Sequence, residues 1–313
     1  MSGGVFLGVD GGGTKTEFVC IDGGGEVLAT ALTGTTYHLQ VGFDEVVRRL
    51  ETGAAQVCAA IGITPQGIDH AFFGLPAYGE DRDIDPRIHA ACGAVLGHDR
   101  YDVGNDMVCG WAGSLGGEDG INIVAGTGSI GYGERQGKAA RAGGWGEVFS
   151  DEGSAYWIAI KGLALFTRMS DGRTPRGPLH ETLRTALSLE DDLDVCGRVM
   201  GPPGMGRSEI AGLAGLVSDA AMAGDEAAGA ILDEAARELG DMALALRAAL
   251  GFAEGTAVPL SWSGGVLSRE ARVREEFLRI ASAHGFSLHE PMFSPGYGSA
   301  LYAKNLGLRN ASR

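Results

Sequence analysis

The fold of this chain is decided near its start by the stretch VFLGVDGGGTKT, residues 5–16. A strand-type apolar run precedes a carboxylate, three glycines, a hydroxyl and an ammonium, and a second strand-type run follows at residues 17–21. Glycines let backbone N–H groups approach a ligand because no Cβ stands in the way, and successive N–H groups in such a turn bind anions. The stretch therefore predicts a phosphate-binding hairpin, with Asp10 placed to hold a metal ion. A glycine-rich turn without chemistry is the alternative, because glycine loops are weak motifs.

Alternating strand and helix patterns follow this hairpin. We expect a third strand at residues 26–32, a helix at 44–61, a strand at 68–75, a helix at 86–96, a strand at 101–104 and a helix from 107. Three strands followed by alternating helices and strands indicate an α/β domain with a mixed sheet.

The pattern restarts after residues 115–120. Strand-type runs at 121–125 and 130–135 flank a second glycine–hydroxyl turn at 126–129. The same hairpin in both halves favours a duplicated, two-lobed protein, with coincidence between two glycine-rich turns as the alternative. The elements expected beyond it are helices at 151–166, 178–187, 208–222, 225–250 and 270–284, strands at 257–263 and 286–291, and a last helix from 294–296 through 306.

Charge narrows the classes of partner. The 313 residues carry 25 Lys and Arg against 40 Asp and Glu, a formal net charge of -15. A nucleic-acid-binding protein needs a basic footprint, so we expect neither nucleic acid nor an anionic membrane surface as a partner. A phosphorylated ligand stays open because local N–H groups and a metal ion can override the net charge.

Cysteine use points to a reducing compartment. The five cysteines are scattered, odd in number and without a C-x-x-C pair: Cys20, Cys58, Cys92, Cys109 and Cys196. We expect free thiols. Since we find no signal peptide or transmembrane run, we expect a cytoplasmic protein.

Asp106 is a candidate general base. It directly follows an apolar strand and precedes a helix, and open α/β folds bind ligands at the carboxyl ends of their strands. A carboxylate there could accept a proton from a substrate hydroxyl. Taken alone, it more often serves as a helix N-cap, a role that Asp often fills.

Two later stretches each allow a functional and a structural interpretation. Trp145, flanked by glycines at 143–146, presents a flat face suited to a sugar or nucleotide ring, or it covers the core. Asp151 and Glu152 either accept hydrogen bonds from sugar hydroxyls or sit in the first turn of the helix at 151–166. Residues 201–208 have Walker A spacing, but Arg207 replaces the lysine and no clean strand precedes them, so we interpret them as a loop between helices.

Together these stretches resemble the sugar kinase, Hsp70 and actin superfamily, and more narrowly the branch of N-acetylglucosamine kinases and BadF/BadG-type ATPases. The resemblance covers nearly the whole chain, and residues 143–158 carry its most specific part. The matching segments are residues 8–15, 105–106, 126–129, 143–146, 151–158, 263–266 and 295–300.

The resemblance implies two RNase H-like lobes with mixed sheets, and ATP and sugar in the cleft between them. Residues 1–117 would form the sugar-side lobe with the catalytic Asp106, and residues 118–293 the nucleotide-side lobe with helical insertions. Residues 294–313 would form a helix that packs back on the first lobe. We also expect a homodimer.

The resemblance also implies the site. Asp106 would be the catalytic base toward the sugar 6-hydroxyl, and Asp10 would hold Mg²⁺. ATP would be bound by the two turns and by a third glycine pair: Gly11, Gly12, Gly13, Thr14, Lys15, Gly126, Thr127, Gly128, Gly264 and Gly265. The sugar would be contacted by Tyr37, Asn105, Ser129, Gly144, Trp145 and Asp151.

The substrate expected from the resemblance is N-acetylglucosamine, phosphorylated at its 6-hydroxyl. Tyr37 stands where animal N-acetylglucosamine kinases have an asparagine that contacts the sugar, and the loop at 74–79 with Tyr78 also departs from theirs. Glucosamine or another hexose is therefore an alternative substrate. From another class, an ATPase activator of a CoA-ester dehydratase or reductase shares this resemblance, but it requires paired cysteines.

Overall fold

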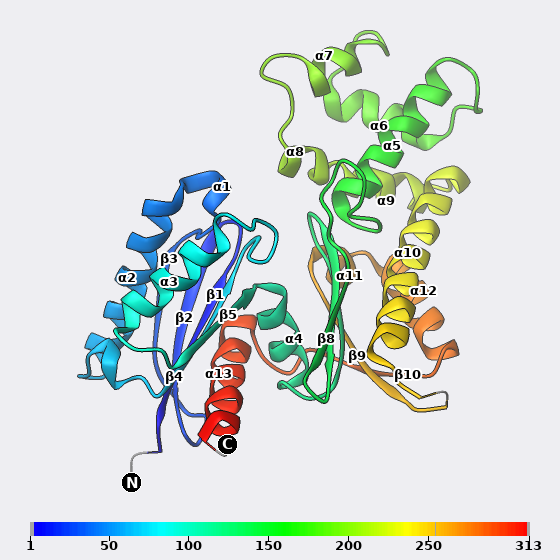
Figure 1. Cartoon of the computed structure of the whole chain (residues 1–313). Helices are drawn as coiled ribbons and strands as arrows, with labels where there is room; N and C mark the ends of the chain where they lie inside the picture. Colours follow the sequence, from blue (N-terminus) through cyan, green and yellow to red (C-terminus); the bar gives the residue numbers. More distant parts are fainter. Residues whose placement is uncertain (1–2, 254, 312–313) are drawn as a thin grey trace. The chain divides into compact units, whose positions relative to one another are not determined.

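The computed structural model describes residues 3–253 and 255–311, which form two compact units (Figure 1). Unit 1 takes in the described residues up to Gly120 and those from His289 onward, and unit 2 spans Ile121–Leu288. Within these described ranges, no helix is long and apolar enough to cross a membrane.

Unit 1 is built on a five-stranded sheet in the order β3-β2-β1-β4-β5. Antiparallel pairing joins β1 to β2 and β2 to β3, whereas β4 runs parallel to β1 and β5 parallel to β4. The strands are β1 (Val5–Gly11), β2 (Lys15–Asp22), β3 (Val27–Gly34), β4 (His70–Leu75) and β5 (Tyr101–Asn105). The helices are α1 (His38–Val41), α2 (Phe43–Ala60), the 3₁₀ turn η1 (Pro65–Gly67), α3 (Asp85–Leu96), α4 (Met107–Leu115) and α13 (Pro295–Ala311).

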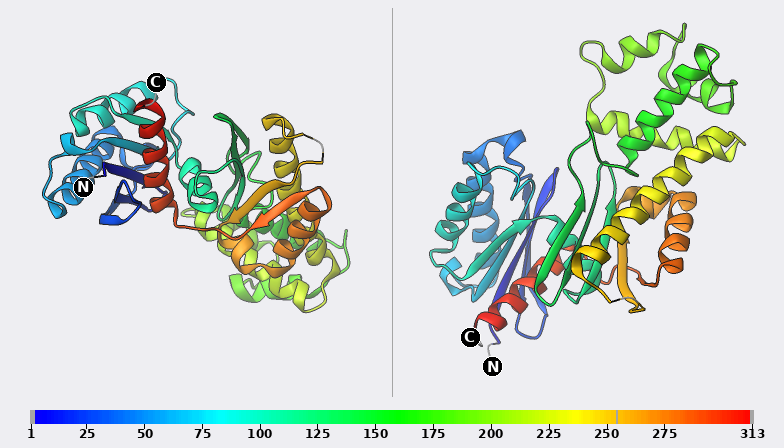
Figure 2. Two further views of the ribbon diagram at one scale, coloured as in Figure 1. Left: turned by 90° about the horizontal axis from the view of Figure 1, so that it is seen from below. Right: turned by 45° about the vertical axis from the view of Figure 1, so that its right-hand side comes forward.

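Helices cover both faces of this sheet (Figure 2). Side chains alternate along a strand, so Leu7 and Val9 of β1 face the core that α2 and α3 complete. The opposite face of β1 carries Phe6, Gly8 and Asp10, and α13 packs there, with α4 against α13, β4 and β5. A Cβ on Gly8 would stand 2.1 Å from the backbone nitrogen of Ala300 in α13. Only a residue without a side chain allows this approach of helix to strand.

Unit 2 repeats the arrangement. Its sheet has the order β10-β9-β6-β7-β8, so its strands, counted along the chain, take the same places as those of unit 1. The strands are β6 (Gly120–Ala125), β7 (Ser129–Arg135), β8 (Lys138–Gly143), β9 (Val258–Ser263) and β10 (Phe286–His289). The helices are α5 (Ala155–Ser170), α6 (Pro178–Leu187), α7 (Asp194–Met200), α8 (Arg207–Gly212), α9 (Ala214–Met222), α10 (Glu226–Leu250), α11 (Gly265–Arg269) and α12 (Ala271–Ala283). The predicted α/β class with two RNase H-like lobes is confirmed.

Two expected helices differ in the structure. The helix expected at 151–166 begins only at Ala155, because Ser154 is its N-cap and accepts a hydrogen bond from the Trp157 N–H at 3.1 Å. The prediction that Asp151 and Glu152 lie in its first turn was wrong; Asp151 has a left-handed φ of 60° in the preceding turn. The helix expected at 208–222 breaks into α8 and α9 at Leu213, whose N–H bonds to the Ile210 carbonyl three residues back.

The loop expected at 201–208 is found between α7 and α8. The element before it is the helix α7, which sequence reasoning had not identified, so the strand that a Walker A motif requires is absent there. Strand β8 was also missed, because its sequence KAARAG has no alternation of apolar and polar residues.

Gly8→Ala tests the contact between β1 and α13. The added methyl group would overlap the α13 backbone, which a side-chain rotation cannot relieve. We expect the free energy of unfolding, from urea titration, to fall by about 3 kcal/mol or more. Gly67→Ala in η1 is the matched control in unit 1, since its Cβ would be 3.4 Å from the nearest atom. Equal stability of the two variants would contradict this packing.

Candidate functional site

Three parallel strands of unit 1 bring the predicted polar residues to one edge of the sheet. The register pairs Asp10 with Gly74, and Leu75 with Asn105. Asp106 follows directly, at the start of α4. Parallel pairing therefore aligns the ends of β1, β4 and β5, and it brings the candidate metal ligand and the candidate base into one electrostatic environment.

Asp10 and Asp106 both have a raised pKa. Burial is the larger cause for both, and it raises the pKa of Asp10 to about 6 and that of Asp106 to about 7. A neighbouring carboxylate disfavours a second negative charge, so the charge of Asp10 adds to the shift of Asp106, and that of Glu17 to the shift of Asp10. Burial raises the pKa of the Cys109 thiol, and its hydrogen bond to Asp10 partly offsets the rise in the pKa of Asp10.

The side chain of Asp106 is not a helix cap. It occupies the N-cap position of α4, but no cap hydrogen bond reaches its carboxylate. Asn105 takes that role, since its Oδ1 accepts a hydrogen bond from the Met107 N–H at 3.1 Å. The carboxylate of Asp106 is thus not committed to the cap that sequence reasoning had left open.

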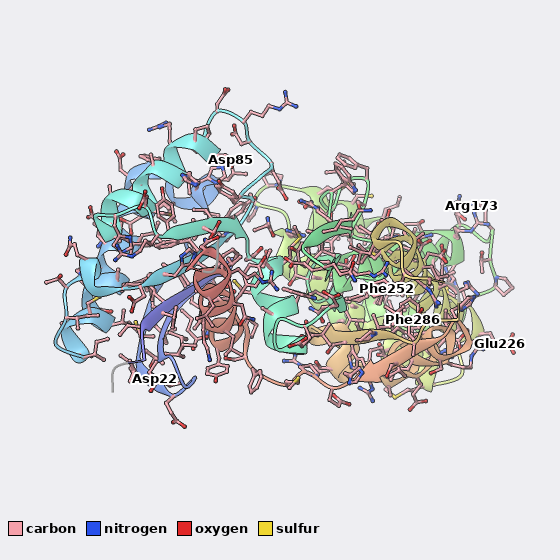
Figure 3. The ribbon with its side chains drawn as sticks, turned by 60° about the horizontal axis from the view of Figure 1, so that its bottom comes forward. Asp22, Asp85, Arg173, Glu226, Phe252 and Phe286 are labelled. Carbon is pink, nitrogen blue, oxygen red and sulfur yellow. The ribbon has the colours of Figure 1, made fainter. Side chains whose placement is uncertain are left out.

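The side-chain nitrogen of Asn105 fixes the Tyr78 loop, because Nδ2 donates to the Tyr78 carbonyl at 3.3 Å. The same loop is held from its far end, where Asp85 Oδ2 accepts a hydrogen bond from the Gly79 N–H at 3.0 Å; Figure 3 shows Asp85 at the start of α3. The loop at residues 74–79 is therefore anchored to Asn105, which directly precedes Asp106.

The opening turn is supported by a threonine pair that sequence reasoning treated only as a polar loop. Thr35 Oγ1 donates to the Gly12 carbonyl at 2.7 Å and accepts from the Tyr37 N–H at 3.0 Å. A Cβ on Gly11 would lie 2.5 Å from Thr36 Oγ1. Tyr37 is thereby tied to the turn, while Gly13, Thr14 and Lys15 are exposed at its tip.

Parallel pairing of strands also brings two glycine turns of unit 2 together. Strand β6 runs parallel to β9, with Val124 opposite Ser263. The turn at 126–129 and the pair Gly264–Gly265 thus leave the same edge of the sheet. A Cβ on Gly264, whose φ is 95°, would lie 2.4 Å from the Ala125 carbonyl oxygen, so this position requires glycine.

A cavity of about 750 Å³ opens beside these turns. It falls within the size range of small-molecule sites. Of the predicted ATP-binding residues, Gly126, Thr127 and Gly265 line it, whereas Gly128 and Gly264 do not. Sequence reasoning missed the wall that α8, α9, α11 and Glu270, directly after α11, contribute. Ser218 of α9 hydrogen-bonds to Glu270 in this wall. The small and polar residues of this wall carry no motif.

The loop at 143–154 lies against the same turn. The Ser129 hydroxyl donates to the Glu152 carbonyl at 2.7 Å. Gly144 has a left-handed φ of 71°. Trp145 is 70% exposed, and the Arg141 guanidinium carbon lies 5.6 Å from its ring centroid. Asp151 is buried, and that burial raises the pKa of its carboxyl group, an effect that Arg207 opposes.

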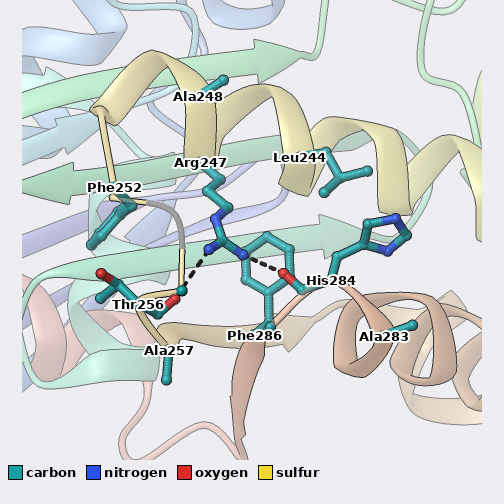
Figure 4. Close-up of a pocket in the computed structure, with 11 residues that line it drawn as sticks. Leu244, Arg247, Ala248, Phe252, Thr256, Ala257, Ala283, His284 and Phe286 are labelled. Carbon is teal, nitrogen blue, oxygen red and sulfur yellow. Dashed lines mark hydrogen bonds between the residues drawn. The ribbon is translucent and has the colours of Figure 1, made fainter.

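A second cavity, of about 680 Å³, lies at the opposite end of β9 (Figure 4). Thr256 and Ala257, which precede β9, contribute to its lining. The Arg247 guanidinium donates to the Thr256 carbonyl at 3.1 Å and to the His284 carbonyl. The Arg247 side chain thus links the segment of Thr256 to that of His284. We therefore assign this cavity to the structural support of unit 2 and not to the candidate site.

Known proteins match this chain along most of its length. The sequence model of the BadF/BadG/BcrA/BcrD ATPase family matches residues 7–303. The chain is 28% identical to the N-acetyl-D-glucosamine kinase of Dictyostelium discoideum over 97% of its own length and 99% of that protein. It is 31% identical to the N-acetylmuramic acid/N-acetylglucosamine kinase of Clostridium acetobutylicum, over 88% and 89% respectively. A candidate N-acetylglucosamine kinase from Chromobacterium violaceum has a similar structure, with a TM-score of 0.69, 25% identity and coverage of 96% and 98%.

The raised pKa of Asp106 predicts a stability difference that depends on pH. Below the ordinary pKa of 3.8 this carboxyl group is protonated in the folded and unfolded states. Between there and about pH 7 only the folded state keeps the proton, so the wild type loses stability as pH rises. We expect Asp106→Asn to be more stable than the wild type by about 1–3 kcal/mol at pH 8 and equal to it near pH 3.5.

Urea titration across this pH range measures the effect. Asp99→Asn, at an exposed position before β5, is the control and should follow the wild-type curve. A parallel curve for Asp106→Asn would show that its carboxylate is not destabilised by its surroundings.

Proposed function

Because the chain belongs to the BadF/BadG/BcrA/BcrD ATPase family, we propose that it is an ATP-dependent kinase that phosphorylates the 6-hydroxyl of N-acetylglucosamine. Two relatives named as kinases of this sugar align with 97% and 88% of the chain. The observation that carries the proposal is the carboxylate of Asp106, which is desolvated, uncommitted to a cap and placed at the carboxyl end of β5.

In this proposal Asp106 is the general base. A base works best when its pKa lies near the working pH, and the pKa of Asp106 is raised to about 7. The carboxylate accepts the proton of the 6-hydroxyl as the oxygen attacks the γ-phosphorus of ATP. The O–P bond forms, the bond to the ADP oxygen breaks, and the products are the sugar 6-phosphate and ADP.

Asp10 suits a Mg²⁺ ion that arrives with ATP. Such ions are held by one or two carboxylates together with substrate phosphates, and not by a full protein cage. Asp10 provides one carboxylate, and the described residues hold no group of three or more potential ligands. Burial and Glu17 raise the pKa of Asp10, and Cys109 and Lys15 offset this only in part, so a bound cation would stabilise its anionic form. When bound, Mg²⁺ neutralises charge on the phosphates.

Each unit contributes one part of ATP binding in this proposal. The 750 Å³ cavity of unit 2, lined by Gly126, Thr127 and Gly265, takes the nucleoside end. The exposed tip at residues 13–15 in unit 1 offers backbone N–H groups, a hydroxyl and the Lys15 ammonium to the phosphates. The residues proposed from the sequence for ATP are Gly11, Gly12, Gly13, Thr14, Lys15, Gly126, Thr127, Gly128, Gly264 and Gly265.

The sugar-binding residues of the proposal again come from both units. Unit 2 provides Ser129, Gly144, Trp145 and Asp151, of which Trp145 offers an exposed aromatic ring. Unit 1 provides Tyr37, which Thr35 ties to the opening turn at Gly12, and Asn105, which directly precedes Asp106. Tyr37 and Tyr78 are the residues to vary if glucosamine or another hexose proves to be the better substrate.

A coupled ADP-release assay over glucose, glucosamine, N-acetylglucosamine and N-acetylmannosamine tests the substrate. We expect the highest kcat/KM with N-acetylglucosamine and none of this turnover without Mg²⁺. A preference for glucosamine would keep the kinase but change its substrate. Sugar-independent ATP hydrolysis alone would favour the activator class, although the five cysteines are free and four of them are buried.

Asp106→Asn tests the base. We expect kcat to fall by about 10²–10⁴ while the sugar dissociation constant from calorimetry changes little, because the amide keeps the shape but cannot take the proton. In the wild type, kcat/KM should rise with pH through an apparent pKa near 7. Asp99→Asn should leave both quantities unchanged. Near-normal kcat in Asp106→Asn would remove this residue from the base role.

A further inference from the structure

Arg207 is an unassigned cation beside a proposed sugar ligand. It is the first residue of α8 and follows the loop with Walker A spacing. Its Nη2 lies 2.5 Å from Asp151 Oδ2, and its Nε lies 3.3 Å from Glu147 Oε2. The Asp151 side chain is only 4% exposed, whereas that of Arg207 is 44% exposed. A nearly buried carboxylate therefore has a half-exposed cationic partner at the start of a helix from another part of the chain.

The ion pair lies directly against the turn at 126–129. A Cβ on Gly128 would stand 2.6 Å from Arg207 Nη2 and 2.8 Å from Asp151 Oδ2. Gly128 does not have a left-handed φ, so its backbone conformation does not explain the glycine. Its close contact with the ion pair does. The contact joins three segments that the sequence places far apart: the turn, the loop of Asp151 and the start of α8.

Asp151 depends on this contact for its orientation. Its backbone is in the left-handed region at φ 60°, where a residue other than glycine is strained and is held by its surroundings. Its carbonyl accepts a hydrogen bond from the Ser154 N–H at 3.1 Å, which fixes the backbone. The carboxylate accepts a hydrogen bond from the Arg207 side chain, and the Ser129 backbone N–H also reaches it.

We propose that Arg207 is a positioning residue, which holds the Asp151 carboxylate in the orientation that receives the sugar hydroxyls. This rests on the proposed function, in which Asp151 contacts the sugar. Arginine suits the task because its planar fork fixes the direction of the carboxylate as well as its charge.

Direct binding of phosphate by Arg207 fits the contacts less well. Two carboxylates, from Asp151 and Glu147, already face its guanidinium group, so this cluster carries a net negative charge when all three groups are ionised. An incoming phosphate would meet two anions at this cation. The local charge therefore favours a partner for Asp151 over an anion ligand.

The role predicts a distinct dependence on pH. Burial and the charge of Glu147 raise the pKa of Asp151, whereas Arg207 and the Ser129 backbone N–H lower it. Without Arg207 the carboxyl group should take up a proton at higher pH and lose its full acceptor capacity. Sugar binding would then weaken further as pH falls from 8 to 6.

Arg207→Met and Arg207→Lys test the proposal. In Arg207→Met we expect the KM for the sugar to rise about tenfold to a hundredfold, as for a lost charged hydrogen bond, and the KM for ATP to stay within about twofold. The rise should be larger at pH 6 than at pH 8. Arg207→Lys keeps the charge but not the fork, so it should restore part of the affinity and remove the extra loss at pH 6.

Arg272→Met is the matched control. Arg272 is also in unit 2, is 46% exposed and forms an ion pair with Asp233 at 2.7 Å. It should leave the sugar KM unchanged. Circular dichroism and urea unfolding show whether each variant is folded, and if Arg207→Met is not, the Arg207→Lys measurement at pH 6 and 8 decides alone.

Several outcomes would overturn the proposal. One is an unchanged sugar KM in folded Arg207→Met. Another is a raised ATP KM with normal sugar binding, which would assign Arg207 to the phosphates. Absence of turnover by the wild type on all four sugars would instead overturn the proposed function. Calorimetric sugar binding by wild type and variants then still tests the ion pair.

Discussion

Parallel pairing at the centre of each sheet is the constraint on which the rest of the molecule depends. Because β1, β4 and β5 run in one direction, their last residues reach one edge, and the charge of Asp10 helps to raise the pKa of Asp106. Pairing of β6 with β9 does the same for two glycine turns in unit 2. The strand order is repeated, so one topological rule provides a carboxylate pair in one unit and a nucleotide-sized cavity in the other.

The fold places the proposed catalytic carboxyl groups where their ionised forms are unfavourable. Asp10 and Asp106 are desolvated near each other, which disfavours their charged forms. The large apolar core around β1 and α2 supplies the stability that makes this tolerable. In unit 2 the strain is in the backbone, where Asp151 takes a left-handed φ. Such local strain is common at functional sites, because the surrounding structure over-determines the geometry.

Much of the fold could be predicted from the sequence because its signals are local. The glycine turn after an apolar run marked the first hairpin, and its recurrence at residues 126–129 marked the duplication. The start of α5 could not be found in this way. Acidic residues at 151–152 have the composition of a first helical turn, but the Ser154 cap and the left-handed Asp151 begin the helix later.

The candidate site was predictable where its residues lie next to a strand end, as Asp106 does. It was not predictable where partners come from distant segments. Arg207 and Asp151, which form an ion pair, are 56 residues apart in the sequence. In the sequence, Arg207 stood out only because residues 201–208 nearly match a phosphate-binding loop. The threonine support of the first turn was hidden in the same way, since Thr35 and Gly12 meet only after β2 and β3 pair.

The packing of α13 on β1 also has a consequence for biosynthesis. Unit 1 is assembled from two segments, with the whole of unit 2 encoded between them. On the ribosome, the face of β1 that carries Gly8 stays uncovered until α13 emerges, after unit 2 has been translated. The N-terminal strands must therefore wait with an apolar face exposed, a state in which chaperone binding and aggregation compete with completion of the native unit.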